Sequence, residues 1–250
     1  MAKNRAWIIG ASQSLGAHFA TRMAAEGWAV TGLGRRPAAE AGLPAEVTYV
    51  QADLSVPETL DGLAEKLGDV PELVVYNAVR YPAQSEGPPP LGELEAVFRV
   101  NALAPYRLLL DLLGRPREHF CSCVVVNSDA MYHAREQNGV YSASKAALRV
   151  LTGTLAATCR GGDAAVSTLL VGPLADPQKL AGLRRVAEQR GVTEAEVVRA
   201  FLRKTNTNLV IDALIDFESC YQGLMHMARL GPVANGMMYR LDGGSSGGLV

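Results

Sequence analysis

Short apolar runs rich in β-branched residues alternate with segments of helical periodicity along the whole chain. Runs of this length and composition are typical of buried strands, and seven occur, at residues 6–9, 29–33, 47–52, 73–76, 122–127, 166–171 and 238–241. The apolar spacing between them predicts helices at residues 17–26, 57–67, 94–113, 140–160 and 212–229. Repeated strand–helix units predict right-handed crossovers. We therefore expect an α/β fold with a doubly wound, parallel seven-stranded sheet and helices on both faces.

Two stretches interrupt this alternation. Residues 80–90 hold several prolines, which cannot continue a regular element, so we expect a surface loop there. Residues 174–207 replace the short connection expected before the last helix. Ligands bind at the carboxyl edge of such sheets, so this insertion predicts a lid over the site. No linker rich in Pro, Gly or Ser divides the remainder, and we expect a single domain over residues 1–250.

Capping patterns mark two of the expected helix starts. In a capping box a Ser or Thr side chain and a Glu side chain three positions later satisfy free backbone N–H groups reciprocally. Ser55 and Glu58 predict one at the start of the second helix. Thr193 and Glu196 predict another within the insertion, after a helical piece at 178–190.

The charge balance is near zero, with 24 Lys plus Arg against 25 Asp plus Glu. Nucleic acids and anionic membranes attract clustered positive charge, and no Lys/Arg block occurs, so neither is expected as a partner. No apolar run is long enough to span a bilayer, and no signal-type segment follows Met1. We therefore expect a cytoplasmic protein without a metal site, in which four cysteines are buried thiols: Cys121, Cys123, Cys159 and Cys220.

A turn containing glycine follows the first expected strand and leads directly into a helix. The segment reads Gly-Ala-Ser-Gln-Ser-Leu-Gly, and its small residues allow the backbone to approach a pyrophosphate at the helix N-terminus. This pattern predicts a Rossmann-type dinucleotide site, although a simple tight turn has the same pattern. The cofactor-binding candidates in the turn are Gly10, Ser12, Ser14, Leu15 and Gly16.

The end of the second strand distinguishes the two nicotinamide cofactors. NAD sites place a carboxylate there for the ribose 2′-hydroxyl, but this chain has Gly34 followed by Arg35 and Arg36. Guanidinium groups bind a phosphate in a bidentate manner, which predicts NADP(H); the alternative is a pair of solvated arginines. Asp53 and Leu54 follow the third strand, where Asp53 is placed to reach an adenine edge or to cap a helix.

Tyr141 and Lys145 lie one turn apart at the start of an expected helix, so their side chains share one face. A nearby cation favours the phenolate and lowers the pKa of a phenol toward values useful in acid–base catalysis. Such a pair alone is more often an ordinary helix surface. Ser128, at the end of the fifth strand, and Asn101, within the helix expected at 94–113, add polar groups near the same edge of the sheet.

With these residues the chain resembles the short-chain dehydrogenase/reductase family, over essentially its whole length from residue 9 to residue 244. The resemblance implies that Tyr141 is the general acid/base and that Lys145 lowers its pKa and holds the nicotinamide ribose. It also implies that Ser128 orients a carbonyl group and that Asn101 supports a water leading to Lys145.

Several positions depart from the family pattern. Ser14 replaces the middle glycine of the phosphate turn, and Val79 replaces the glycine after Asn77 and Ala78, two residues that the resemblance assigns to the cofactor site. After the sixth strand Pro173 is carried over, but the family's threonine that contacts the nicotinamide amide is missing. These departures predict weaker cofactor binding, unless the insertion supplies the missing contact.

The short spacing of Tyr141 and Lys145 favours carbonyl over C=C chemistry, because the family's enoyl reductases space the two more widely. The resemblance therefore implies an NADPH-dependent ketoreductase or alcohol dehydrogenase for a small-molecule carbonyl or alcohol, assembled as a homotetramer or homodimer. An epimerase or polyol dehydrogenase, and a non-catalytic NADP-binding sensor, are the alternatives. Candidate substrate contacts, with loop or core positions as the alternative, are His133, Glu136, Met131, Tyr132, Leu174 and Tyr221.

Overall fold

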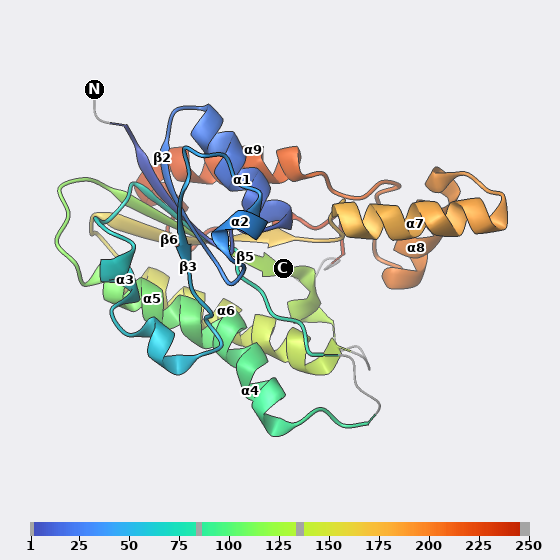
Figure 1. Cartoon of the computed structure of the whole chain (residues 1–250), viewed down its shortest axis with the longest axis horizontal. Coiled ribbons are helices and arrows are strands. Elements are labelled where there is room, and N and C mark those ends of the chain that lie inside the picture. Colours follow the sequence, from blue (N-terminus) through green and yellow to red (C-terminus); the bar gives the residue numbers. More distant parts are fainter. Residues whose placement is uncertain (1–2, 84–86, 134–137, 246–250) are drawn as a thin grey trace.

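The structure, a computed structural model, describes residues 3–83, 87–133 and 138–245 (Figure 1). Its centre is a seven-stranded, all-parallel sheet in the order β3-β2-β1-β4-β5-β6-β7. The chain winds from β1 toward one edge and from β4 toward the other, which confirms the predicted doubly wound, Rossmann-type α/β fold. The strands are β1 (Arg5–Ile9), β2 (Ala29–Gly34), β3 (Thr48–Gln51), β4 (Leu73–Tyr76), β5 (Cys121–Ser128), β6 (Ala164–Val171) and β7 (Met238–Leu241).

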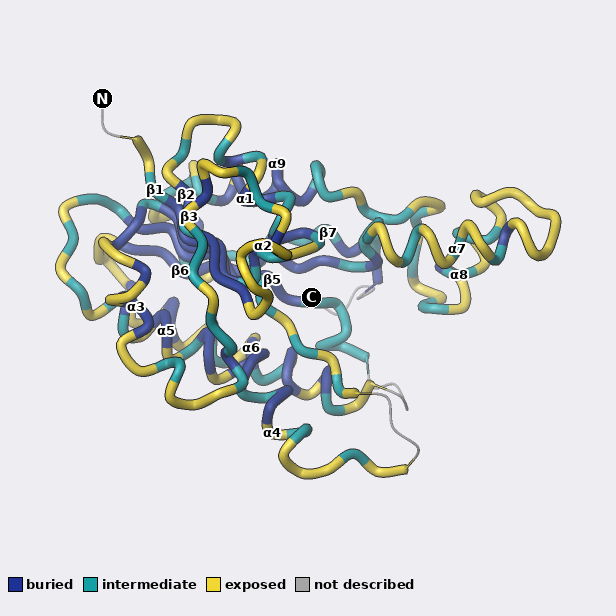
Figure 2. The backbone as a smooth tube through the Cα atoms, viewed as in Figure 1, coloured by how far each residue is buried: buried dark blue, intermediate teal, exposed yellow. Residues whose placement is uncertain are grey.

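Helices cover both faces of the sheet (Figure 1). α1 (Ser14–Ala25) and α9 (Phe217–Arg229) pack on one face, and α5 (Ala104–Leu113) and α6 (Gly139–Thr158) pack on the other. The central strands are consequently buried from both sides, and Figure 2 shows them as a dark blue layer between partly exposed helices. This double cover explains why their sequences are continuous apolar runs.

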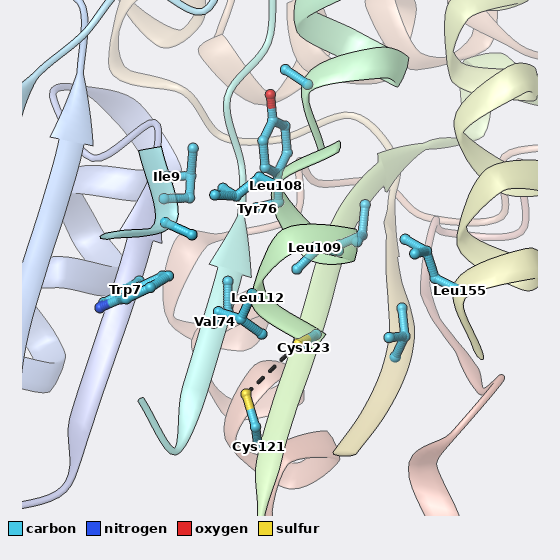
Figure 3. Packing of buried hydrophobic residues seen from close by; sticks show 14 of the residues in the cluster. Trp7, Ile9, Val74, Tyr76, Leu108, Leu109, Leu112, Cys121, Cys123 and Leu155 are labelled. Carbon is cyan, nitrogen blue, oxygen red and sulfur yellow. Dashed lines mark hydrogen bonds between the residues drawn. The ribbon is translucent and has the colours of Figure 1, made fainter. Parts of the chain in front are cut away.

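The core beneath α5 and α6 combines alternate strand residues with helix leucines (Figure 3). Trp7 and Ile9 of β1 reach this cluster, while Ala6 and Ile8 point to the opposite face, as the two-residue period of a strand requires. Cys121 and Cys123 lie in the same cluster with their Sγ atoms 3.8 Å apart. All four cysteines are buried and free, as the sequence predicts.

The prediction of one continuous helix at residues 57–67 is wrong. The segment divides into a 3₁₀ turn (Pro57–Leu60) and the one-turn helix α3 (Leu63–Lys66), because Gly62 between them adopts a left-handed conformation with φ 64°. The prediction that Ser55 and Glu58 form a capping box here is also wrong. Ser55 instead donates hydrogen bonds from its N and Oγ to Asp53 Oδ1, at 2.9 and 2.6 Å.

The helix expected at 94–113 contains a π turn that its sequence pattern does not reveal. α4 (Leu91–Phe98), the π turn (Arg99–Leu103) and α5 follow one another without a break. A π turn adds a residue to the helical path and often lies at a functional site. Here it carries Asn101, whose side chain is fully buried.

The insertion forms two helices that project beyond the end of the sheet (Figure 1). α7 (Pro177–Arg190) is capped by the side chain of Asp176, and α8 (Glu194–Thr205) opens with the predicted capping box of Thr193 and Glu196. The first turn of α7 faces the carboxyl edge of the sheet, where it lines a cleft described below. Among the described helices, which include the short α2 (Ala38–Ala41), none has the length and apolar composition needed to cross a membrane.

Candidate active site

The carboxyl ends of the strands open into one cleft of about 950 Å³, which is within the usual range for small-molecule sites. Because all strands are parallel, the residues that follow them converge on this edge. Most of the predicted site residues line the cleft: Gly10, Ser12, Ser14, Leu15, Arg35, Arg36, Asp53, Leu54, Asn77, Ala78, Ser128, Tyr141 and Lys145. Gly16, Asn101 and Pro173 are not part of this lining.

The turn after β1 is shaped by contacts that only glycine permits. The N–H groups of Gly10 and Ala11 both donate to the carbonyl oxygen of Leu33, at 2.7 and 2.8 Å, and Gly10 has φ 90°. A Cβ atom on Gly16 would lie 2.0 Å from the Gly10 oxygen. Gly16 therefore acts by letting α1 pack against the turn. Asn77 adds a hydrogen bond from its Nδ2 to the Gly10 oxygen at 3.3 Å.

Ser14 connects the phosphate turn to the insertion. It is the first residue of α1 and the sole non-glycine residue with a positive φ, 53°, among the described residues. Its Oγ donates a hydrogen bond to Oδ2 of Asp176, whose Oδ1 accepts from the backbone N–H of Gln178 at 3.0 Å. A carboxylate from the insertion thus lies at the N-terminus of α1. Sequence analysis missed this contact, and only an Asp-Pro pair typical of a helix start hinted at the role of Asp176.

The second strand ends at an exposed pair of arginines. β3 side chains hold the backbone of Arg35 and Arg36: Tyr49 Oη donates to the Arg36 oxygen at 2.9 Å, and Gln51 Nε2 donates to the Arg35 oxygen at 3.3 Å. At Gly34 a Cβ atom would lie 2.6 Å from the Tyr49 hydroxyl oxygen and 2.7 Å from Ser12 Oγ, so an acid at this position would require both side chains to shift. Both arginine side chains line the cleft, and neither forms an ion pair within the described residues.

Asp53 anchors the turn after β3. Partial burial raises the pKa of its carboxyl, but the hydrogen bonds from Ser55 and the charges of Arg35 and Arg80 together outweigh that effect, and the net pKa lies below the ordinary value. The carboxylate is therefore ionised and oriented by a local turn, so the helix-capping alternative is wrong. Leu54 beside it is buried. The contact of Asp53 with an adenine ring stays a prediction.

Tyr141 and Lys145 lie in the first turns of α6 with almost fully buried side chains. Lys145 Nζ is 5.9 Å from the centre of the Tyr141 ring and donates to the Val126 oxygen at 3.5 Å. Burial lowers the pKa of Lys145 to about 8. Burial, with a contribution from Tyr81, raises the pKa of Tyr141 well above its ordinary value, and a hydrogen bond with Ser128 acts in the opposite direction. In the free protein Tyr141 is therefore protonated, and the lowering of its pKa that was expected from Lys145 is not observed.

Ser128 is held by residues on both sides of it. Its Oγ accepts from the N–H of Ala130 at 3.2 Å and donates to Asp129 Oδ1 at 3.2 Å. Asn127, which sequence analysis missed, accepts the N–H of Ser128 at 2.9 Å and donates from Nδ2 to the Lys145 oxygen at 3.1 Å. Asn127 thus fixes the end of β5 to the start of α6.

Asn101 lies behind the cleft wall and binds the loop that follows β4. Its Oδ1 accepts from the N–H of Arg80 at 2.8 Å. Its Nδ2 donates to the Arg80 oxygen at 2.9 Å and to Ser144 Oγ at 3.0 Å. Both amide protons therefore have partners in the protein. The water that Asn101 is expected to support stays a prediction.

The remaining candidates have other contacts. The Pro173 oxygen accepts from the N–H of Ile215 at 2.9 Å, away from the cleft lining. Tyr221 belongs to the core between α1 and α9, and its hydroxyl donates to Glu26 at 2.8 Å. The prediction that Tyr221 contacts the substrate is therefore wrong. Leu174 lines the cleft, whereas His133, Met131 and Tyr132 do not, and Glu136 lies outside the described residues.

Several lining residues come from the two irregular segments and were missed. Arg80, Tyr81 and Glu93 line the cleft around the loop after β4, and Arg80 forms an ion pair with Glu93 at 2.6 Å. Lys179 of α7 lines it from the insertion, where burial lowers its pKa. Such loops carry no periodic pattern, so the sequence offered no signal for these side chains.

Comparison with known proteins agrees with this arrangement. A model of the short chain dehydrogenase family matches residues 4–178. The chain belongs to this family. Short-chain dehydrogenases are oxidoreductases that use a nicotinamide cofactor, and this activity accounts for a dinucleotide turn and a Tyr/Lys pair in one cleft. None of the curated proteins compared with the chain matches it in sequence.

Solved structures of short-chain dehydrogenases share the fold at low identity. L-sorbose reductase from Gluconobacter frateurii, complexed with NADPH and L-sorbose, has a TM-score of 0.82 at 19% identity, covering 99% of this chain and 98% of that one. A 4-hydroxyisoleucine dehydrogenase complexed with NADH has a TM-score of 0.82 at 18% identity, covering 98% and 100%. A short chain dehydrogenase from Burkholderia cenocepacia J2315, in complex with NADP, has a TM-score of 0.74 at 22% identity, covering 97% of each chain.

Proposed function

We propose that this short-chain dehydrogenase is an NADPH-dependent ketoreductase, which in reverse oxidises a secondary alcohol. The supporting observation is that two groups of residues with different chemistry line one cleft. Arg35 and Arg36 lie at the end of β2, and Ser128, Tyr141 and Lys145 lie together at the end of β5 and the start of α6. A nicotinamide dinucleotide can extend along this cleft, with its adenosine end at the arginine pair and its nicotinamide end at Tyr141 and Lys145.

The arginine end favours NADPH over NADH. Gly34 carries no carboxylate, and the backbone of Arg35 and Arg36, which both line the cleft, is fixed by Tyr49 and Gln51. Guanidinium groups match the geometry and charge of a 2′-phosphate. The turn at Gly10 and the N-terminus of α1 would hold the pyrophosphate through backbone N–H groups.

The other end carries the proton chemistry. The bound cofactor supplies hydride to the carbonyl carbon, and negative charge then develops on the carbonyl oxygen. Ser128 Oγ and Tyr141 Oη are the donors that stabilise this charge, and Tyr141 transfers its proton to complete the alcohol. The buried Lys145 cation stabilises the phenolate left on Tyr141. Asn127 holds the end of β5 against the start of α6 and so positions both donors. The single hydroxyl proton of Ser128, which Asp129 accepts in the free protein, turns to the carbonyl oxygen when substrate binds.

The test measures NADPH oxidation by the purified protein with a panel of ketones. We expect turnover that Tyr141→Phe reduces by at least a hundredfold, because the proton donor is lost. Tyr106→Phe on α5, outside the cleft, is the matched control and should retain wild-type activity. Tight binding of NADPH without turnover of any ketone would overturn the reductase proposal in favour of a sensor.

A further inference from the structure

Tyr81 lies directly on the catalytic candidate Tyr141. The two rings are stacked with their centres 4.6 Å apart and their planes 22° apart. Tyr141 is buried, at 6% exposure, whereas Tyr81 is 59% exposed although it is a large aromatic residue. Stacking of this kind stabilises an aromatic pair beyond what the buried area alone contributes. Neither acid–base catalysis nor the packing of the core accounts for an exposed ring at this point.

The segment that carries Tyr81 is anchored on both sides. Asn101 binds both the N–H and the oxygen of Arg80, immediately before it. Glu93 of α4 binds the Arg80 guanidinium and accepts from the N–H of Ala83 at 3.1 Å. The main chain is therefore fixed on each side of Tyr81. Its ring is held at the cleft by its neighbours and not by burial.

Val79 extends the same surface. It is 43% exposed, it lines the cleft together with Tyr81, and it stands where the family pattern has glycine. Exposed apolar side chains that gather at a groove mark ligand-binding surfaces more often than chance exposure does. Val79 and Tyr81, two positions apart on the same anchored segment, thus add exposed apolar surface to the cleft that also contains Tyr141.

We propose that Tyr81 is a specificity-determining residue, which with Val79 forms an apolar wall that selects carbonyl compounds with a flat apolar substituent over polyhydroxylated sugars. The proposal rests on the proposed function and names its substrate class. An aromatic substituent continues the stack on Tyr81, whereas hydroxyl groups of a sugar lose their hydrogen bonds to water against Val79 and Tyr81 without protein partners. The wall thus distinguishes a ketoreductase for apolar ketones from a polyol dehydrogenase.

Binding is the primary test, because it is independent of turnover. Calorimetry on the full chain with NADP⁺, which cannot reduce a ketone, compares acetophenone with fructose. We expect wild type to bind acetophenone at least tenfold more tightly than fructose. Tyr81→Ala should weaken acetophenone binding by about tenfold and leave fructose unchanged, and Tyr81→Phe, which keeps the ring, should restore the preference. Val233→Ala, at a more exposed apolar residue outside the cleft, is the control.

Two outcomes overturn the inference: equal binding of the two compounds by wild type, or tighter binding of acetophenone by Tyr81→Ala, which would make Tyr81 an obstruction. Turnover with NADPH is measured separately on the same proteins. Selective binding without reduction would overturn the proposed function alone and support the apolar wall. Reduction of fructose in preference to acetophenone would support the oxidoreductase and overturn the wall.

Discussion

The hydroxyl of Ser14 donates a hydrogen bond to the carboxylate of Asp176, so the first residue of α1 is joined to the residue that caps α7. The cap residue of α1, Gln13, gives that helix no side-chain hydrogen bond. The anionic group at this helix N-terminus therefore comes from the insertion. This is also where the pyrophosphate of a dinucleotide is expected. Asp176 and the cofactor then compete for one electropositive position.

Replacing Asp176 should strengthen cofactor binding. Asp176→Asn keeps the shape and a hydrogen-bond acceptor for Ser14 while removing a negative charge that faces the pyrophosphate. Two like charges at a solvated site repel by about 1 kcal/mol, so we expect roughly fivefold tighter binding of NADPH, measured by calorimetry. Glu188→Gln on α7, which removes the same charge at an exposed position outside the cleft, should leave affinity unchanged. Weaker binding by Asp176→Asn would show that the carboxylate instead helps to hold the cofactor.

Much of the fold could be predicted because its signals are local. The central strand sequences are apolar on both faces, and β4 and β7 begin and end at the predicted residues. Gly10 and Gly16 mark the turn, since the packing of α1 against it leaves no room for a side chain. Thr193 and Glu196 are adjacent on one helical turn, so their capping box is visible in the sequence.

The rest depends on contacts between distant segments. Residues 57–67 have helical spacing, but Gly62 adopts a left-handed conformation and divides them. The presence of one glycine in a sequence does not predict that its φ is positive. The π turn at Asn101 is fixed by that residue's bonds to Arg80 and Ser144, which tertiary packing alone brings near. The contact of Tyr81 with Tyr141 depends on this same anchoring. No periodic pattern encodes it.

The choice of cofactor depends on the arginine pair. In the double variant Arg35→Ser/Arg36→Ser the 2′-phosphate loses its charge-assisted hydrogen bonds, so NADPH affinity should fall by roughly ten- to a hundredfold. NADH lacks this phosphate and should bind as it does to wild type. The double variant Arg199→Ser/Arg203→Ser removes the same charge from exposed positions of α8 and controls for net charge. An equal loss for both cofactors would contradict a 2′-phosphate site.

Asn101 should contribute more to stability than an ordinary polar residue. In Asn101→Ala the part-buried N–H and oxygen of Arg80 and the buried Ser144 hydroxyl all lose a partner. Unsatisfied buried groups are costly, and we expect a loss of about 3 kcal/mol in the free energy of unfolding, measured by urea denaturation. Asn208→Ala at an exposed position should change it by less than about 0.5 kcal/mol. A small loss at Asn101 would mean that water replaces the amide.

Lys145 should make stability depend on pH in a defined window. Burial lowers its pKa from 10.5 to about 8 in the folded protein. Between these values the unfolded chain binds a proton at Lys145 that the folded protein does not, so this residue's contribution to stability rises with pH. Below pH 8 both states are protonated, and its contribution is constant and unfavourable. Over the whole window the gain is about 3 kcal/mol.

Lys145→Met isolates this contribution, because it keeps the length of the side chain and removes the charge. Wild type alone would obscure it. The hydrogen bond with Cys121, together with burial, raises the pKa of Cys123, and burial raises that of Cys220, so the unfolded state loses those protons first and their effect on stability falls with pH. Both proteins share that effect, and subtraction removes it. We expect the free energy of unfolding of wild type, relative to Lys145→Met, to rise between pH 8 and 10.5 in urea titrations. A flat difference would show that the folded protein leaves the pKa of Lys145 at its ordinary value, and the ammonium would then be solvated and not buried beside Tyr141.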